Sequence, residues 1–240
     1  MSRLTIVEAG LLSRRFRERH GSFPQMFERL IRAADPSINF DVVSVAAGEP
    51  LPDPRELQAI LITGSAAGVY DKLDWIARLE EFVRAAYGSG APMVGVCFGH
   101  QLIAQALGGV VRKSDKGWGI GRHVYGIAPG NGIVDGEHIA IPCSHQDQVI
   151  EPPAGARTIL FSDFTPHAGL LYANGATFSV QPHPEFSASF AYELCEAREG
   201  DAPEAVVAEG KSSLAEPLDN ARLGDAIARF VTRRAASGIS

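Results

Sequence analysis

The first half of the chain alternates between short apolar runs and longer amphipathic segments. Each apolar run is four or five residues long and is bounded by turn residues, a pattern typical of buried parallel strands. The segments between them repeat apolar residues three and four positions apart, which predicts helices. The predicted strands cover residues 4–7, 41–45, 59–62 and 93–96, and the predicted helices cover residues 23–34, 73–87 and 101–107. This order predicts a mostly parallel sheet with helices on both faces.

After Gly108 the pattern changes to β-type segments separated by Gly, Pro and Asn turns. These segments cover residues 122–128, 138–142, 158–161 and 177–181, and they predict a mixed or antiparallel extension of the sheet. Helical patterns return from residue 187 to about 197 and from about 219 to 234, with a charged segment to about 214 between them. We expect this tail to pack on the main sheet.

The length and hydrophobicity of the chain suit one α/β domain of three layers. The 240 residues are 45% hydrophobic, enough for one large core. We expect a single domain over residues 1–240, with a core of about residues 4–190 and a helical tail of about 191–240. The Pro-rich segment at residues 48–54 is interpreted as a connecting loop rather than a domain linker.

Charge and cysteine usage exclude several classes of function. The 28 acidic and 22 basic residues give a net charge of −6, and no dense Lys/Arg cluster indicates a nucleic-acid surface. No apolar run has the length of a secretory or membrane segment, so we expect a cytoplasmic protein without a membrane partner. The three cysteines are widely spaced and odd in number, which argues against disulfides and CxxC sites.

The segment MVGVCFGHQLIAQALGG places Cys97 where a predicted strand meets a predicted helix. This is the context of a nucleophile elbow, in which a sharp turn exposes the reactive side chain. Gly95 and Gly99 would let the strand and helix approach closely, and the helix N-terminus would favour the thiolate. Taken alone, Cys97 could equally be a small buried apolar residue.

The segment VQPHPEF supplies a base and an orienting group for such a nucleophile. His183 precedes Pro184, which favours extended backbone and would place His183 and Glu185 on one side of a strand. The Glu185 carboxylate could then fix the imidazole tautomer. An isolated His-Pro-Glu is more often a turn or a surface pair, but together with the elbow it predicts a catalytic triad of Cys97, His183 and Glu185.

Two motifs in this order resemble those of the class I glutamine amidotransferases. The GxCxGxQ elbow is matched by Gly95, Cys97, Gly99 and Gln101, and the QxHPE segment by Gln181, His183, Pro184 and Glu185. The resemblance covers roughly residues 4–186. Within the family, the chain resembles the glutaminase domain of GMP synthase and the γ-glutamyl peptidases. The resemblance implies a flavodoxin-like fold, no cofactor, and attack by Cys97 on the side-chain amide of glutamine or a γ-glutamyl compound. A γ-glutamyl thioester would form and be hydrolysed by water.

The same resemblance implies further site residues. The oxyanion hole would use the backbone amide of Phe98 and a donor from the loop ILITGSAAGVYD, where Gly64 and Ser65 are the candidates. The family commonly has two consecutive glycines there, so Ser65 is a departure. Gln101 resembles the family glutamine that helps to hold the substrate.

His145 and Asp147, in PCSHQDQV, lie where related domains carry a similar His/Asp segment near the cleft, and a substrate-pocket role is one hypothesis for them. A role outside the pocket is a nearly equal alternative. Neither helical spacing nor cysteine partners indicate a metal site, so we expect no metal. Cys143 and Cys195 are interpreted as core thiols.

Four functions remain open at this point. The chain could be a glutaminase or γ-glutamyl hydrolase that acts alone on a small-molecule substrate. It could be the glutaminase subunit that delivers ammonia to a separate synthetase, or a catalytically quiet binding module of the same fold. A cysteine protease or deglycase-like hydrolase is the fourth, and the QxHPE segment argues against it.

Overall fold

The computed structural model describes residues 2–237, and within them a nine-stranded sheet forms the centre of the molecule. Its strands are β1 (Arg3–Glu8), β2 (Asn39–Ser44), β3 (Ile60–Ile62), β4 (Met93–Val96), β6 (Gly119–Ile127), β7 (His138–His145), β9 (Arg157–Phe161), β10 (Gly169–Leu171) and β11 (Thr177–Val180). The spatial order is β2-β1-β3-β4-β11-β10-β9-β6-β7. A separate pair, β5 (Val110–Lys113) and β8 (Asp147–Glu151), forms a two-stranded antiparallel sheet.

The central sheet is mixed. Strands β2, β1, β3, β4 and β11 pair in parallel, whereas β11, β10, β9, β6 and β7 pair antiparallel in that order. The predicted parallel half and its antiparallel extension are therefore both confirmed. Strand β4 lies within the parallel part, between β3 and β11, so the residue that follows it emerges between two neighbours at the carboxyl-end edge. Parallel α/β sheets place ligands at this edge.

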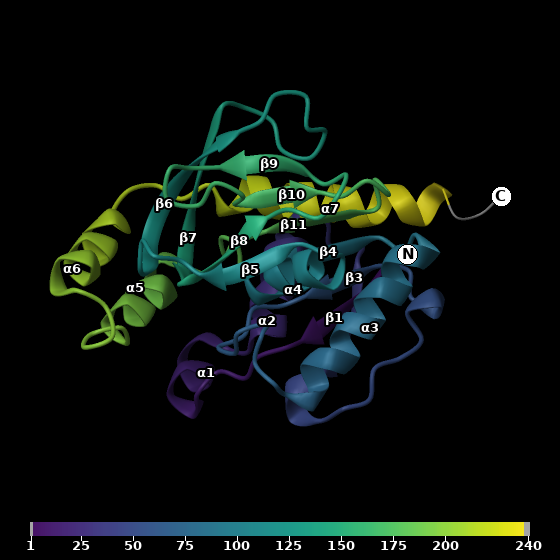
Figure 1. Ribbon diagram of the computed structural model, residues 1–240, viewed down its shortest axis with the longest axis horizontal. Helices are drawn as coiled ribbons and strands as arrows, with labels where there is room; N and C mark the ends of the chain where they lie inside the picture. The colour runs from purple at the N-terminus through teal and green to yellow at the C-terminus, as the bar shows by residue number, and fades with distance from the viewer. Residues whose placement is uncertain (1, 238–240) are drawn as a thin grey trace.

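Helices cover both faces of the sheet. They are α1 (Arg14–His20), α2 (Phe23–Ala34), α3 (Asp74–Ser89), α4 (Phe98–Ala106), α5 (Ala188–Glu196), α6 (Glu204–Ser213) and α7 (Asn220–Ser237). One core joins the sheet to α2 and α7, and a second joins its other face to α3 and α4. A third, smaller core is formed largely by α5, α6 and Ile120 of β6. Figure 1 shows α5 and α6 at one end of the molecule, beside β6 and β7.

The boundaries of α2 show how the sequence sets a helix. Ser22 accepts a hydrogen bond from the Gln25 backbone, and the Gln25 side chain accepts one from the Ser22 backbone, which completes a capping box. Pro24 lies in the first turn, where it costs no hydrogen bond. The predicted range, residues 23–34, is therefore the observed one. The tail also behaves as expected, because α7 packs with α2 on the main sheet.

The pattern did not predict five elements: α1, α6, β5, β8 and β10. Helix α1 buries none of its residues, so it has no apolar stripe for periodicity to detect. Strand β10 has three residues, and β5 and β8 have four and five, so each is too short for an alternation to stand out. Between β2 and β3 the chain crosses in a loop with two 3-10 turns, Val45–Ala47 and Pro54–Glu56, and this loop contains the Pro-rich segment.

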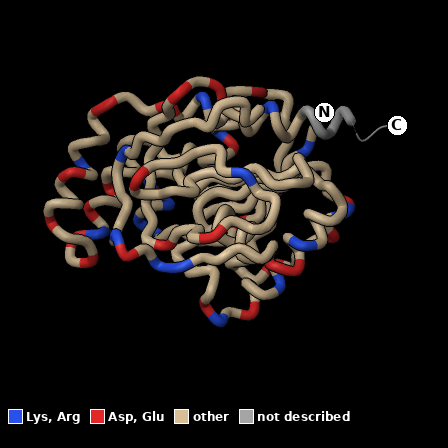
Figure 2. The backbone as a smooth tube through the Cα atoms, turned by 45° about the horizontal axis from the view of Figure 1, so that its top comes forward, with Lys and Arg blue, Asp and Glu red and all other residues tan. Residues whose placement is uncertain are grey.

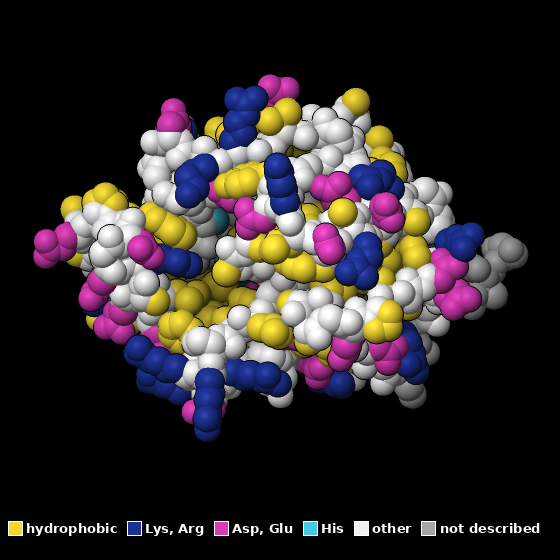
Figure 3. Space-filling view, turned by 60° about the horizontal axis from the view of Figure 1, so that its bottom comes forward, with side chains coloured by type: hydrophobic (Ala, Val, Ile, Leu, Met, Phe, Trp, Pro, Cys, Tyr) yellow, Lys and Arg dark blue, Asp and Glu magenta, His cyan; other side chains and the backbone are white. Residues whose placement is uncertain are grey.

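Charged residues of both signs are spread over the surface, as the red and blue segments of Figure 2 show. On the face in Figure 3, Lys and Arg side chains gather along one edge, beside a hollow lined by hydrophobic side chains. Among the helices that the structure describes, none combines the length and hydropathy required to cross a membrane.

Candidate active site

Cys97 occupies a strained turn between β4 and α4. Its backbone has φ 52° and ψ −103°, and within residues 2–237 it is the only non-glycine residue with positive φ. Such a conformation costs about 1–3 kcal/mol and persists only where neighbouring structure enforces it. Two backbone bonds do so here, from Cys97 N to Val180 O at 2.9 Å and from Gln101 N to Cys97 O at 3.0 Å. The geometry is that of a nucleophile elbow.

The two glycines that flank Cys97 are required by close backbone contact. A Cβ on Gly95 would lie 2.5 Å from the carbonyl oxygen of Gly99, and a Cβ on Gly99 would lie 2.3 Å from that of Ile62. No side chain fits at these distances. The helix therefore begins at Phe98, three residues before the predicted start, because the turn brings it directly against β3 and β4.

His183 and Glu185 form a buried pair in which the imidazole Nδ1 lies 2.7 Å from the carboxylate Oε1. The contact between the two side chains is the one expected from the sequence, but the backbone that carries them is not the expected strand. Strand β11 ends at Val180, so both residues lie in the turn beyond the strand, where Phe186 N donates to His183 O at 3.3 Å. The Phe186 ring stacks on the imidazole with centroids 3.9 Å apart and planes 9° apart, which fixes the orientation of the ring.

The electrostatics of His183 favour its charged form. Burial alone would lower the pKa of the imidazole, but the charges of Glu185 and Cys97, with hydrogen bonding to both, outweigh burial and raise this pKa to about 10. Because Nδ1 is bonded to Glu185, Nε2 is the nitrogen left to exchange a proton with the sulfur. The arrangement therefore provides an oriented imidazolium beside the Cys97 sulfur at neutral pH.

The loop after β3 brings Gly64 against both of these side chains. A Cβ on Gly64 would lie 2.9 Å from His183 Cε1 and 3.7 Å from Cys97 Cβ, so a larger residue would displace the imidazole. The Ser65 hydroxyl accepts a hydrogen bond from Ala67 N at 3.2 Å, which turns it into its own loop. Phe98 is the first residue of α4, and its N–H has no acceptor within the helix. Gly64 and Phe98 thus lie directly beside Cys97, and Ser65 lines the same cleft.

A cleft of about 410 Å³ opens beside Cys97. Gln101, His145 and Asp147 all line it. The Gln101 side-chain nitrogen donates to Asp147 O at 2.9 Å and to Gln181 Oε1 at 3.0 Å, so both of its N–H groups are used within the protein. Its carbonyl oxygen is the group left to face a substrate, which makes Gln101 an acceptor rather than a donor.

His145 and Asp147 are also held by internal bonds. His145 Nδ1 bonds to the backbone oxygen of Asp147 at 3.1 Å, and burial lowers the pKa of this imidazole to about 3, so the ring is neutral. The Asp147 carboxylate accepts a hydrogen bond from the Tyr70 hydroxyl at 2.9 Å. Sequence reasoning did not identify Tyr70, Asp71, Lys113 or Arg198, which also line the cleft, and it assigned no role to Trp118. They lie on separate loops and strands, and only the fold brings them together.

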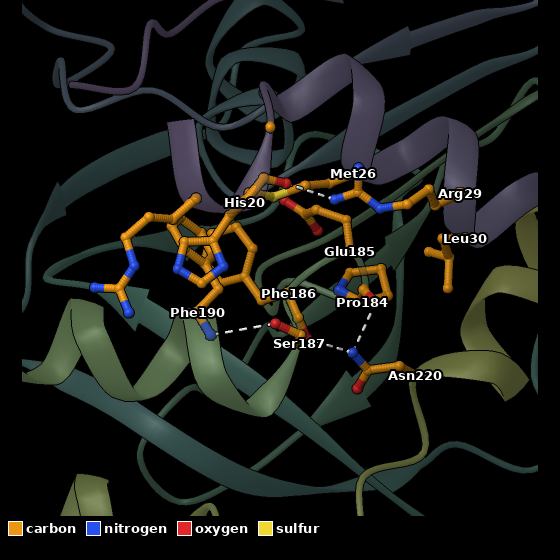
Figure 4. Close-up of a pocket in the computed structure, with 12 residues that line it drawn as sticks. His20, Met26, Arg29, Leu30, Pro184, Glu185, Phe186, Ser187, Phe190 and Asn220 are labelled. Carbon is orange, nitrogen blue, oxygen red and sulfur yellow. Dashed lines mark hydrogen bonds between the residues drawn. The ribbon is translucent and has the colours of Figure 1, made fainter. Parts of the chain in front are cut away.

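A second hollow of about 670 Å³ lies beside Glu185 and is also bordered by Met26 and Asn220 (Figure 4). The Asn220 side-chain nitrogen donates to Pro184 O at 2.8 Å and to Phe186 O at 2.7 Å, one bond on each side of Glu185. The tail therefore holds the turn that carries the carboxylate. No motif pointed to this residue, because its role depends on where the N-terminus of α7 docks.

The other two cysteines are buried in the core, as predicted. Burial raises the pKa of the Cys143 thiol well above its ordinary range and that of Cys195 to about 11. Both thiols are therefore poor nucleophiles at neutral pH. Among residues 2–237, no group of three His, Cys, Asp or Glu side chains is placed to hold a metal ion.

Known proteins with related sequences include a synthase component and peptidases. The glutamine-hydrolyzing GMP synthase subunit of Sulfolobus acidocaldarius is 30% identical over 62% of this chain and 78% of its own length. The γ-glutamyl peptidase 3 of Arabidopsis thaliana is 29% identical over 65% of this chain and 66% of its own. The chain thus spans about two thirds to four fifths of these relatives.

Solved structures share the fold over nearly the whole chain. A glutamine amidotransferase from Methylobacillus flagellatus superposes with a TM-score of 0.76 at 19% identity, covering 97% of this chain and 94% of that one. One from Thermotoga maritima gives 0.72 at 19% identity, covering 96% and 98%. The family model described as "Glutamine amidotransferase class-I" matches residues 20–193, well over half of the sequence. The chain belongs to the class I glutamine amidotransferase family.

Proposed function

We propose that this chain hydrolyses the side-chain amide of glutamine or of a γ-glutamyl compound through a γ-glutamyl thioester on Cys97. One observation carries the proposal: the oriented His183–Glu185 pair lies beside a cysteine held in a strained elbow at the edge of a cleft. A nucleophile, a base and an orienting carboxylate are the three groups that this reaction requires. The family supports the same reaction class.

In the first half of the reaction the Cys97 sulfur attacks the γ-carbonyl carbon. The developing oxyanion is stabilised by backbone N–H groups of the Gly64–Ser65 loop and of Phe98. The C–N bond then breaks, and His183 gives its proton from Nε2 to the leaving nitrogen, which departs as ammonia or an amine. The product bound to the enzyme is the γ-glutamyl thioester.

In the second half a water molecule replaces the leaving group. His183, now neutral, takes a proton from this water as it attacks the thioester carbon, and glutamate and the Cys97 thiolate are released. Glu185 stabilises the imidazolium each time that it forms. The Gln101 carbonyl oxygen and the carboxylates of Asp71 and Asp147 suit the α-ammonium group of the glutamyl part.

The test is hydrolysis of L-glutamine and of a small panel of γ-glutamyl peptides by the purified chain, beside Cys97→Ala. We expect turnover that falls at least about a thousandfold in Cys97→Ala, since a triad without its nucleophile retains only binding effects. Cys195→Ala is the matched control and should keep its rate. Turnover that survives in Cys97→Ala would overturn the proposal.

A second candidate function is favoured by the relatives named as glutamine-hydrolyzing components of GMP synthase. Here the chain would be a glutaminase subunit that delivers ammonia to a separate synthetase. This predicts little free hydrolysis but rapid labelling of Cys97 by an electrophilic glutamine analogue. A catalytically quiet module would show neither, so labelling of Cys97 against Cys143 and Cys195 separates the two.

A further inference from the structure

The two sides of the cleft belong to different parts of the protein. One side carries Tyr70, Asp71, Gln101, Lys113, His145 and Asp147. The other side carries Trp118, which packs against the third core with Phe186, and Arg198, which follows α5. Phe186 of the same core stacks directly on the His183 imidazole, so this core connects the Trp118 side of the cleft to the base.

Arg198 presents a cation that its surroundings neutralise only weakly. Its guanidinium carbon lies 4.2 Å from the centre of the Trp118 ring, and its side chain is 29% exposed. Its carboxylate partner, Asp201, is 3.9 Å away on a side chain that is 66% exposed, a distance at which an exposed ion pair contributes little. Arg198 Nε is buried and has no hydrogen-bond partner among the described residues.

The environment also shows that Arg198 lies within electrostatic reach of the reaction centre. Burial lowers the pKa of its guanidinium, whereas the charges of Asp201 and Cys97 act to raise it. A guanidinium that is partly buried and held over an aromatic ring is pre-organised for a planar anion. A carboxylate is such an anion, and guanidinium groups can bind it through two parallel hydrogen bonds.

The chemistry decides which part of a substrate meets this cation. His183 must protonate the leaving nitrogen, so the leaving group extends from Cys97 along the His183 side. The glutamyl part, with its α-ammonium and α-carboxylate groups, then lies toward the opposite side, where Asp71, Asp147 and Lys113 offer both signs of charge. What Arg198 faces is therefore the portion beyond the γ-amide nitrogen.

We propose that Arg198, stacked on Trp118, binds a carboxylate on the leaving group, so that the preferred substrates are γ-glutamyl amides of amino acids or peptides. The inference rests on the proposed function. Attack by Cys97 breaks the γ-C–N bond, His183 protonates the nitrogen, and an amino acid or peptide with a free amino group departs. A cationic leaving group, such as a polyamine, would be repelled, and glutamine itself would gain nothing from this side of the cleft.

The test compares γ-glutamylglycine with γ-glutamylglycinamide, which differ only in the leaving-group carboxylate. We expect the wild-type kcat/KM to favour the acid by about tenfold to a hundredfold, the usual contribution of a hydrogen-bonded charge pair. Arg198→Gln should abolish most of this preference, and Arg198→Lys should restore part of it. Arg157→Gln, a surface arginine on β9, should leave it unchanged. Because the result is a ratio within one protein, partial misfolding does not alter it.

Equal kcat/KM values for the two substrates in the wild type would overturn the inference. So would an Arg198→Gln variant that weakens both equally, because Arg198 would then bind the α-carboxylate or serve the fold. If no substrate is turned over, the proposed function fails first. Calorimetric binding of the same pair to Cys97→Ala then decides separately: preference for the acid that Arg198→Gln removes supports the Arg198 site, and equal binding rejects it.

Discussion

The two sides of the cleft differ in what holds their side chains. On the side of Gln101, His145 and Asp147, each side chain bonds to a neighbour, and β8 begins at Asp147 in register with β5. On the opposite side, Arg198 is held by ring stacking on Trp118 and by a long ion pair. The first arrangement is rigid and its polar groups are mostly used internally. The second leaves a charge available to a ligand. We therefore assign the first side to positioning the substrate and the second side to selecting among substrates.

The origin of the two sides in the chain explains this division. The hydrogen-bonded side arises between β3 and β8, within the residues that match the family model, and so does Trp118 of the opposite side. Arg198 lies just beyond the match, which covers residues 20–193, in the segment between α5 and α6. We therefore expect substitutions on the first side to affect every substrate and substitutions on the second to change which substrate is preferred. Four variants or conditions test this contrast, in descending order of expected effect.

The largest effect is expected at Glu185, which serves the chemistry common to all substrates. Glu185→Gln keeps the shape but loses the charge that stabilises the imidazolium, so kcat should fall by about 10²- to 10⁴-fold for acid and amide substrates alike. Steady-state kinetics on γ-glutamylglycine and its amide measures this. Glu193→Gln is the matched control, since Glu193 is another buried carboxylate paired with a histidine, His20, at 3.1 Å. Equal losses in the two variants would assign Glu185 a structural role.

The contrast also shows how far the sequence could predict the site. Cys97, Gly95 and Gly99 were predictable because a strand, a turn and a helix are encoded by local sequence. His183 and Glu185 were predictable because side chains two residues apart can contact each other in an extended or turn backbone. Trp118 and Arg198 meet only because α5 packs against β6 and β7, a contact between distant segments. Periodicity carries no information about such contacts, so a whole side of the cleft could not be predicted.

A smaller loss is expected at Gln101, on the hydrogen-bonded side. Gln101→Leu removes two internal hydrogen bonds, each worth about 1 kcal/mol, and frees the loop of Asp147. We expect kcat/KM to fall about tenfold, mostly through KM, with the same acid-to-amide ratio as the wild type. Gln105→Leu, one turn further along α4, also breaks two bonds but lies outside the cleft lining, and it should retain activity. A changed ratio in Gln101→Leu would contradict the separation of the two sides.

Asn220 tests whether the tail contributes to chemistry as well as to selection. Asn220→Ala removes both bonds to the turn around Glu185, so we expect kcat to fall about three- to tenfold while KM is retained. The alkaline limb of the pH–rate profile should shift to lower pH, because a less ordered carboxylate raises the pKa of His183 less. Asn174→Ala is the control, since this asparagine also bonds to a turn, at Tyr87 and Thr177, far from the cleft. Equal effects in both would leave Asn220 with a purely structural role.

The smallest effect is expected in the pH dependence of stability, where His183 acts through the fold rather than through a substrate. The folded-state pKa of His183 is raised to about 10, above its unfolded value near 6.5, so the charged pair stabilises the fold fully below pH 6.5. This contribution is lost progressively as the pH rises through 10. The Tm difference between wild type and His183→Gln should therefore be largest near pH 6 and shrink by a few °C toward pH 10. A constant difference would mean that His183 is neutral in the folded protein, and the charged His183–Glu185 pair beside Cys97 would have to be abandoned.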